Sequence, residues 1–409
     1  MIHGPRVHPD PDETVRVVAN LDVESEWAGL RRPGLPRPGL RRAARARIAA
    51  LGSLLRVFCR PGDRLHLAAP LDPARLPSPR SSEEGELPLP ILESPQDGKL
   101  PSCGALLPWG VSPTWPRRLA PTWSRRLRRE RRVDPAVVAR VNDRAHTLEA
   151  ARELGCALPY SRMVSSIDDL QDILDQADAP SAWIVKAPLC AAGRHRILCR
   201  PDLPPPNPDA LRGLFRRHGE LLFEPWLHRV ADYGLLFSVG SAGDDVLEGE
   251  PPKDLSFHHQ NVDDRGAFLG IAITADAPHR PSFLSPEEQA NMVETAIRVA
   301  ERLAQVGYRG PVGIDFWRHR GIDGKAPPTL HPIGEINARL TFGWVARALA
   351  ERLAPEAASQ GRNVELRFGR GPVPADDASG ETIHPLLLPG PDDPTSAWLV
   401  TRPEDPSLG

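Results

Sequence analysis

The segment GEINAR at residues 334–339 constrains the fold most, because apolar and polar side chains alternate along it. Such alternation predicts a β-strand with one polar face. Successive side chains of a strand point to opposite faces, so Glu335, Asn337 and Arg339 should lie together. A sheet that carries this strand presents two oxygen-bearing side chains and a guanidinium on one surface.

An upstream segment, GIDFW at residues 313–317, adds a second carboxylate, Asp315, on a strand of the same kind. Two carboxylates and an amide carbonyl are hard oxygen donors, which Mg²⁺ takes together with phosphate oxygens and water. We therefore interpret Asp315, Glu335 and Asn337 as candidate magnesium ligands. Arg339 would contact a phosphate or carboxylate with its planar fork. The alternative is a solvated strand face on which these side chains bind nothing.

The composition limits the class of protein. The chain has 409 residues, of which 40% are apolar, and a net charge of −2. That length can bury a substantial core in two or three subdomains. No run of about 18 apolar residues occurs, so no membrane-spanning helix is expected. The first residues lack the charged-then-apolar plan of a secretory signal.

A basic run is the one feature that suggests nucleic acid. Residues 117–132 hold eight arginines and one acid. The acidic overall balance and the lack of a surrounding nucleic-acid motif favour a solvated helix or linker instead. The five cysteines are scattered and form no CxxC pair, so neither a zinc site nor a disulfide framework is indicated. We therefore expect a cytoplasmic protein with no nucleic-acid and no membrane partner.

The chain divides into three expected regions. Residues 1–133 predict a small, irregular α/β domain with Pro/Arg-rich loops, including a strand near 14–21 and a helix near 40–57. Residues 134–355 carry the clearest helix and strand signals. Residues 356–409 predict a Pro-rich tail with about two short strands.

The middle region alternates helices and strands. Asp134 before Pro135 predicts one helix start, and Ser285 with Glu288 predicts another through a capping box. Lys186, one of only four lysines in the chain, ends an apolar run. The expected strands, besides the two described above, are residues 181–186, 196–199, 221–227, 232–239, 255–261 and 267–274.

An ordered set of short segments gives the pattern a family likeness. NDR at 142–144, WIVKAP at 183–188, EPWL at 224–227 and GID at 313–315 precede the GEINAR string. This set resembles the ATP-grasp superfamily of carboxylate–amine and carboxylate–thiol ligases, over about residues 134–355. The resemblance implies an α+β ATP-grasp fold whose two subdomains clamp ATP. It also implies an enzyme that activates a carboxylate as an acyl phosphate for attack by an amine or similar nucleophile.

The resemblance implies roles for single residues. Lys186 matches the strand-end lysine that contacts nucleotide phosphate, and Arg144 stands where a second basic residue does similar work. Asp232 matches the acid that holds the ribose hydroxyls. Arg339 matches the residue that contacts the γ-phosphate or acyl phosphate, so Lys186 and Arg339 are the expected catalytic residues. The expected hinge beside the adenine comprises Glu224, Pro225, Trp226 and Leu227.

The implied cofactors are ATP and Mg²⁺ or Mn²⁺, with Asp315, Glu335 and Asn337 as the metal ligands. The implied partners are a small-molecule carboxylate and an amine, and a homodimer is left open. One departure concerns residues 187–195, where the family often has a Gly-rich loop and this chain has a single glycine. A non-catalytic ATP-binding module is therefore kept as the alternative, and an unrelated α/β protein as the third.

Overall fold

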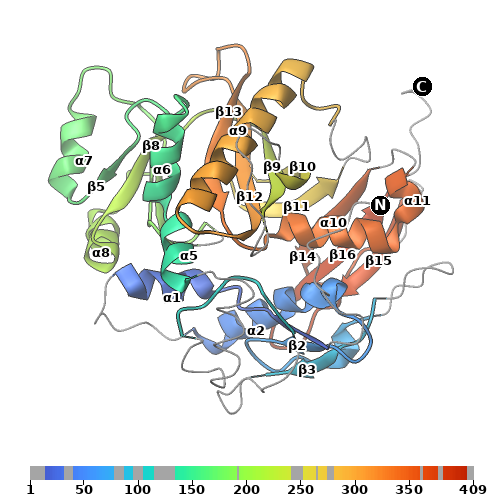
Figure 1. Cartoon of the computed structure of the whole chain (residues 1–409). Helices are drawn as coiled ribbons and strands as arrows, with labels where there is room; N and C mark the ends of the chain where they lie inside the picture. The colour runs from blue at the N-terminus through green and yellow to red at the C-terminus, as the bar shows by residue number, and fades with distance from the viewer. Residues whose placement is uncertain are drawn as a thin grey trace.

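The described part of the chain contains three sheets and the helices that pack on them (Figure 1). Among the residues covered, no helix is long and apolar enough to cross a bilayer. The basic run at 117–132 lies outside the described residues. The computed structural model describes residues 14–31, 40–77, 87–94, 105–114, 134–190, 193–240, 252–263, 266–273, 281–359, 363–375 and 381–402.

The N-terminal sheet is parallel, with strand order β3-β2-β1-β4. Its inner strand β1 is fully buried, as expected where helices cover a parallel sheet, and its one charged residue, Arg16, donates to Glu93 Oε2 at 2.9 Å. Sequence reasoning found the first strand but missed the helix α1 that follows it. The elements are β1 (Val15–Val18), α1 (Val23–Arg31), α2 (Arg42–Gly52), η1 (Ser53–Phe58), β2 (Arg64–His66), η2 (Pro73–Arg75), β3 (Ile91–Glu93) and β4 (Ala105–Pro108).

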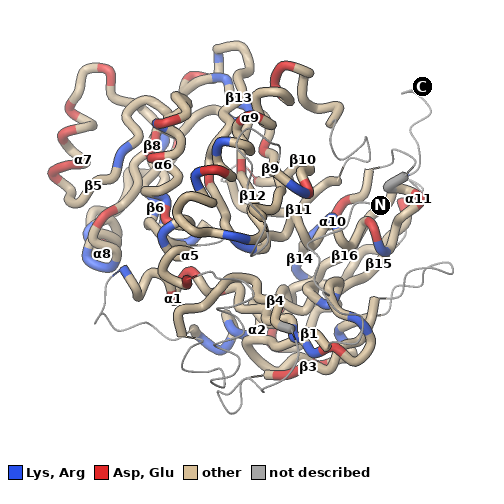
Figure 2. The backbone as a smooth tube through the Cα atoms, in the orientation of Figure 1, with Lys and Arg blue, Asp and Glu red and all other residues tan. Residues whose placement is uncertain are grey.

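A second, small sheet is antiparallel, with strand order β5-β8-β6-β7. The strands expected at residues 181–186 and 196–199 are confirmed as β6 and β7, which pair antiparallel. Two helices pack on this sheet around Phe223 and Val185. Figure 2 shows acidic residues along helix α7 and basic residues at the end of helix α8. The elements are β5 (Arg162–Val164), α7 (Ile167–Leu174), β6 (Trp183–Lys186), β7 (Arg196–Cys199), α8 (Pro208–His218) and β8 (Leu221–Pro225).

The large sheet has eight antiparallel strands in the order β13-β12-β9-β10-β11-β14-β16-β15. The three antiparallel strands expected before Ser285 and the two site strands are confirmed. Where the region 356–409 is described, it holds three strands rather than the expected two, and these extend the same sheet. The strands are β9 (Arg229–Val239), β10 (Lys253–Val262), β11 (Phe268–Ile273), β12 (Gly310–His319), β13 (Thr329–Asn337), β14 (Val364–Arg370), β15 (Thr382–Leu387) and β16 (Thr395–Thr401).

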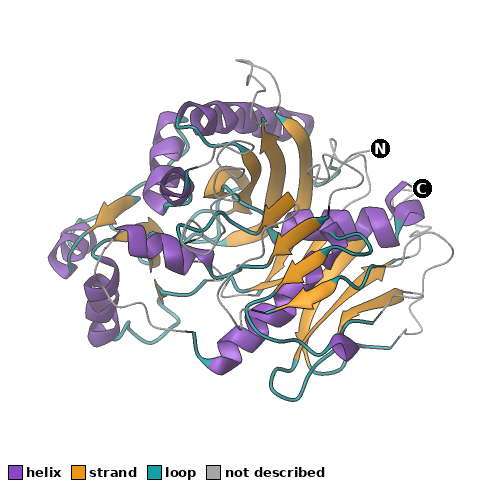
Figure 3. Cartoon of the chain, turned by 60° about the horizontal axis from the view of Figure 1, so that its bottom comes forward, coloured by secondary structure: helices purple, strands orange, loops and turns teal. Residues whose placement is uncertain are grey.

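Two helices, α5 and α9, begin where the capping residues of the sequence predict. The side chain of Asp134 accepts a hydrogen bond from the backbone of the first turn of α5, and Ser285 and Glu288 form both bonds of a capping box at α9. The long helix α9 packs against β9 and β13 and lies across the strands (Figures 1 and 3). The helices in this part of the chain are α5 (Pro135–Val141), α6 (Arg144–Glu153), α9 (Pro286–Gln305), α10 (Phe342–Leu353) and α11 (Pro355–Ser359), of which α11 was not predicted.

Candidate functional site

The β12–β13 hairpin brings the predicted metal ligands together. Asp315 and Glu335 are direct cross-strand partners. The Asn337 amide nitrogen donates to Asp315 Oδ2 at 3.1 Å. Gln260 of the neighbouring part of the sheet, which sequence reasoning missed, donates to Asp315 Oδ1 at 2.7 Å. In the sequence, Gln260 is marked only by its position two residues after His258 on the same expected strand, which puts both side chains on one face. The structure shows that this face is the one that carries Asp315.

The electrostatics of this cluster suit a divalent cation. Burial, and then the charge of Glu335, raise the pKa of Asp315 to about 6. Two carboxylates held side by side repel each other, and a cation between them would relieve that repulsion. Within the described ranges, no group of three or more His, Cys, Asp or Glu converges on one point. A magnesium ion held by Asp315 and Glu335 would therefore take further oxygens from Asn337, water or phosphate, which is its usual habit.

Arg144 contacts one of these carboxylates. Its Nη2 donates to both Glu335 oxygens, at 2.9 and 3.0 Å, and its Nη1 donates to the Ala187 carbonyl at 2.5 Å. Arg144 is buried at the start of α6, where the Asp143 side chain caps the helix. The residue that the family likeness assigns to phosphate thus joins β13 to the loop after β6. That loop is closed by a backbone bond from Ala187 N to His195 O, at 3.0 Å.

Lys186 and Glu224 form an ion pair across the small sheet, with 2.5 Å between Nζ and Oε2. Only 14% of the Lys186 side chain and 11% of the Glu224 side chain are exposed. Burial acts to raise the pKa of Glu224, but the charge and hydrogen bond of Lys186 outweigh it and hold that pKa below its usual range. Burial lowers the pKa of His331 in β13 to about 4, and the charges of this pair also act on it, Glu224 raising that pKa and Lys186 lowering it.

The predicted hinge follows directly after this pair. β8 ends at Pro225, and the Trp226 backbone N–H donates to the Ala182 carbonyl at 2.8 Å. Leu227 is buried. The hinge residues therefore form a fixed bend between the small sheet and β9, in the place where the family likeness expects the adenine.

Arg229, the first residue of β9 and two positions after the hinge, contacts the hinge and was missed by sequence reasoning. Its guanidinium carbon lies 3.9 Å from the ring centroid of Trp317 and 5.2 Å from that of Trp226. Its Nη1 donates to Asp232 Oδ1 at 2.8 Å. Asp232, the expected ribose ligand, is thus paired with a cation from its own strand. The sequence does offer one signal for this contact. Trp317 lies two positions after Asp315, so its ring is expected on the same strand face as the candidate metal ligand, where a cation can stack on it.

Arg339 completes the cluster from beyond the end of β13. Its Nη2 donates to Asn337 Oδ1 at 3.0 Å, so it extends the bonded series that runs from Gln260 through Asp315 and Asn337. Its Nε lies 2.8 Å from Oε1 of Glu24, and its guanidinium lies over Trp109. Two residues of the N-terminal part of the chain, Glu24 and Trp109, therefore contact this site directly.

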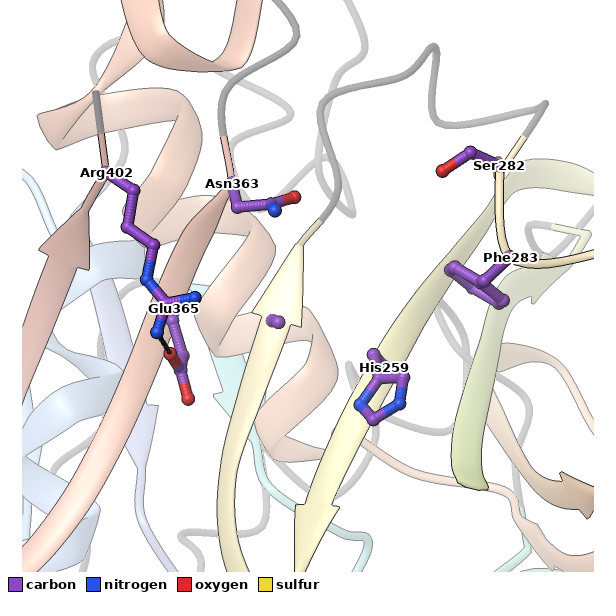
Figure 4. A pocket seen from close by; sticks show the side chains of 7 residues that line it. His259, Ser282, Phe283, Asn363, Glu365 and Arg402 are labelled. Carbon is purple, nitrogen blue, oxygen red and sulfur yellow. Dashed lines mark ion pairs between the residues drawn. The ribbon is translucent and has the colours of Figure 1, made fainter. Parts of the chain in front are cut away.

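A separate cavity of about 210 Å³ lies away from these residues (Figure 4). In Figure 4 Arg402 and Glu365 face each other on one side, and His259 and Phe283 lie on the other. His259 neighbours His258, and adjacent strand residues point to opposite faces. The remaining lining residues are Ala272, Ser282 and Asn363.

The chain has structural likeness to known proteins but no detected sequence relative. No protein-family model and no curated protein matches it. An N5-carboxyaminoimidazole ribonucleotide synthetase in complex with ADP superposes with a TM-score of 0.54 at 12% identity, covering 97% of this chain and 94% of that one. A biotin carboxylase from Campylobacter jejuni in complex with β,γ-ATP gives 0.53 at 12% identity, with 96% and 88% covered. An N5-carboxyaminoimidazole synthetase from Staphylococcus aureus with ADP gives 0.50 at 10% identity, with 97% and 95% covered.

These likenesses define the class of fold. The chain has the ATP-grasp fold, as the ordered segments of its sequence predicted, and the likeness extends over nearly its whole length. At 10–12% identity they define the fold alone. The roles of single residues remain predictions.

Proposed function

We propose that the chain is an ATP- and Mg²⁺-dependent ligase that activates a small-molecule carboxylate for attack by an amine or similar nucleophile. The observation that supports this most is the bonded cluster of Asp315, Asn337 and Arg339, with Glu335 opposite Asp315. It supplies oxygen ligands for a metal and a guanidinium for a phosphoryl group within one contiguous set. The solved proteins with this fold named above were crystallised with ADP or an ATP analogue, which supports a nucleotide as the ligand.

The reaction has two steps. A carboxylate oxygen attacks the γ-phosphorus of ATP, the bond from that phosphorus to the β,γ-bridging oxygen breaks, and ADP leaves with the electron pair. The amine then attacks the acyl carbon, the C–O bond to phosphate breaks, and the amine loses a proton. Both steps gather anions, so catalysis depends on positive charge and positioning. A bound magnesium ion would supply part of that charge.

The residues of this chain would share the remaining work. Lys186 would orient the nucleotide phosphates, and Arg339 would hold the transferred phosphoryl group. Arg144 would keep Glu335 aligned through its two hydrogen bonds. The hinge and Asp232 would bind the adenosine part, with Asp232 exchanging Arg229 for the ribose hydroxyls.

An ADP-release screen tests the function. The full chain is incubated with ATP, Mg²⁺ and pooled carboxylic acids and amines, and ADP is measured with and without each pool. Substrate-dependent ADP release is the expected result. No ADP release together with no ATP binding by calorimetry would contradict both this proposal and the alternative below.

One observation favours a second candidate, a non-catalytic ATP-binding module. Each of the predicted cations is already paired with an acid of the chain, and the phosphate loop has a single glycine. ATP binding without ADP release in the same screen would support this second candidate.

A further inference from the structure

Glu24 is a carboxylate from the N-terminal domain that lies inside the candidate site. It occupies the first turn of α1, and only 6% of its side chain is exposed. Its Oε1 lies 2.8 Å from Arg339 Nε, which is itself 11% exposed. Burying a carboxylate costs desolvation free energy, which a nearby positive charge such as Arg339 must offset.

The contact is close but leaves hydrogen-bonding capacity unused. Within the described part of the chain, no hydrogen bond of good geometry joins Arg339 Nε to Glu24, although Nε lies only 2.8 Å from Oε1. The two groups are therefore held together by charge rather than by an aligned bond. Buried donors and acceptors are normally hydrogen-bonded. The poor alignment of this pair is therefore consistent with a second partner, such as a bound anion, that replaces Glu24 beside Arg339.

The surrounding structure fixes both members of the pair. The Asn20 side chain, just before α1, donates to the Gly110 carbonyl at 2.7 Å. A Cβ on Gly110 would lie 2.9 Å from a methyl of Val23, so only glycine lets α1 come this close. On the other side, Arg339 Nη2 donates to Asn337 Oδ1 and Nη1 donates to the Leu340 carbonyl. These bonds use two of the five N–H groups of the guanidinium, and Nε–H, which faces Glu24, is one that an oxyanion would take over.

We propose that Arg339 anchors an oxyanion site whose internal occupant is Glu24, and that a tetrahedral oxyanion of the phosphate or sulfate type displaces this carboxylate when it binds. The inference rests on the proposed function in one respect, which is that the ligand of Arg339 is a phosphoryl-type anion. It assigns a new role to the N-terminal domain, because displacement of Glu24 loosens the contact between α1 and the end of β13. The internal carboxylate also keeps weakly binding anions out of the site.

Charge gives the proposal a pH dependence. The charged and titratable groups that face Glu24 are Arg339 from the end of β13, Arg194 and Cys190 from the loop after β6, and Asp22 from the turn before α1. Burial raises the pKa of Glu24, and Arg339 opposes this increase without cancelling it. As the pH falls, Glu24 becomes neutral and competes less for Arg339, so an oxyanion should bind more tightly.

Sulfate is the probe, because it keeps its double charge over about pH 5 to 8. Calorimetry of the full chain without ATP compares wild type, Glu24→Gln and Glu26→Gln. Glu26 is the matched control, since it lies on the same helix but bonds to Ser112 and Thr114. We expect Glu24→Gln to bind sulfate about tenfold more tightly and Glu26→Gln to match wild type. The gain should disappear in the double variant Glu24→Gln/Arg339→Gln.

Equal sulfate affinity in wild type and Glu24→Gln would overturn the proposal, and so would a gain that persists in the double variant. Should Glu24→Gln fail to fold, the pH titration decides: wild type and Glu26→Gln should both bind sulfate more tightly as the pH falls from 7 to 5. A flat profile would overturn the proposal. Because no nucleotide and no turnover enter these measurements, their failure is distinct from failure of the ligase assignment.

Discussion

The ion pairs of the candidate site differ from those on the outer helices. In the site, Lys186 pairs with Glu224 and Arg144 with Glu335, and these partners come from different elements. On the outer helix α8, by contrast, Arg212 pairs with Asp209, which lies three residues away on the same helix. The side chains of that outer pair are 52% and 84% exposed, against 14% and 11% for Lys186 and Glu224.

This difference has an energetic meaning. An exposed pair contributes about 0–1 kcal/mol, whereas removing one member of a buried pair costs about 3–5 kcal/mol because the other charge is left uncompensated. The cations that we assign to phosphate, such as Lys186 and Arg144, therefore also stabilise the protein without nucleotide, because each neutralises a carboxylate. Binding of ATP would exchange one set of charge pairs for another.

The largest effect is expected at the metal ligands. Replacing Glu335 with alanine should reduce Mg²⁺-dependent ADP release at least about a hundredfold, because one of two carboxylate ligands is lost. Since alanine also leaves Arg144 unpaired, Glu335→Gln is the second variant, which keeps an acceptor for that guanidinium. Glu294→Ala on the exposed face of α9 is the control. Unchanged ADP release in both Glu335 variants would refute the metal assignment.

Variants of the Lys186–Glu224 pair distinguish the contribution of Lys186 to stability from its contribution to ATP binding. Lys186→Met should lower the free energy of unfolding by about 3–5 kcal/mol, because Glu224 is left as a buried unpaired charge. It should also weaken ATP binding measured by calorimetry. In the double variant Lys186→Met/Glu224→Gln, stability should largely recover while ATP affinity stays low. Recovery of ATP affinity in the double variant would show that Lys186 serves only to neutralise Glu224.

A buried histidine extends the comparison to titration. His258 lies against Gly234 and Gly343, and burial, followed by the charge of His259, lowers its pKa to about 3. The unfolded chain, with a histidine pKa near 6.5, therefore binds a proton at pH 5 that the folded chain does not, and stability falls as the pH falls. We expect His258 to contribute about 2 kcal/mol to the loss between pH 7 and 5.

Denaturant unfolding at the two pH values measures this contribution. His258→Gln should lose less stability than wild type over that interval, whereas the exposed His228→Gln should lose as much as wild type. Equal losses in all three proteins would mean that His258 is protonated in the folded state.

The sequence predicted most of the fold because its signals there are local. Capping residues marked the start of α9, and alternation placed Asp315 and Glu335 on strands. The order of segments then led to the ATP-grasp fold. α1 and α8 were missed, although Asn207 before Pro208 is a helix start signal.

The contacts of the site could not be predicted in the same way. Arg339 and Glu24 are far apart in sequence, and so are Arg144 and Glu335, so no spacing rule connects them. Glu24 reads as an ordinary first-turn acid, which helices favour at their N-termini. Only the packing of the N-terminal domain against the end of β13 gives it a buried partner.

The smallest effect is expected at the exposed pair on α8, and it completes the comparison. Arg212→Ala should change the free energy of unfolding by less than about 1 kcal/mol, since water screens both charges. ATP affinity should not change, because the pair lies outside the site cluster. Denaturant unfolding and calorimetry on this variant set the baseline for the buried-pair variants. A loss as large as that of Lys186→Met would mean that exposure does not separate the two kinds of pair, and that the energies assigned to the site have another origin.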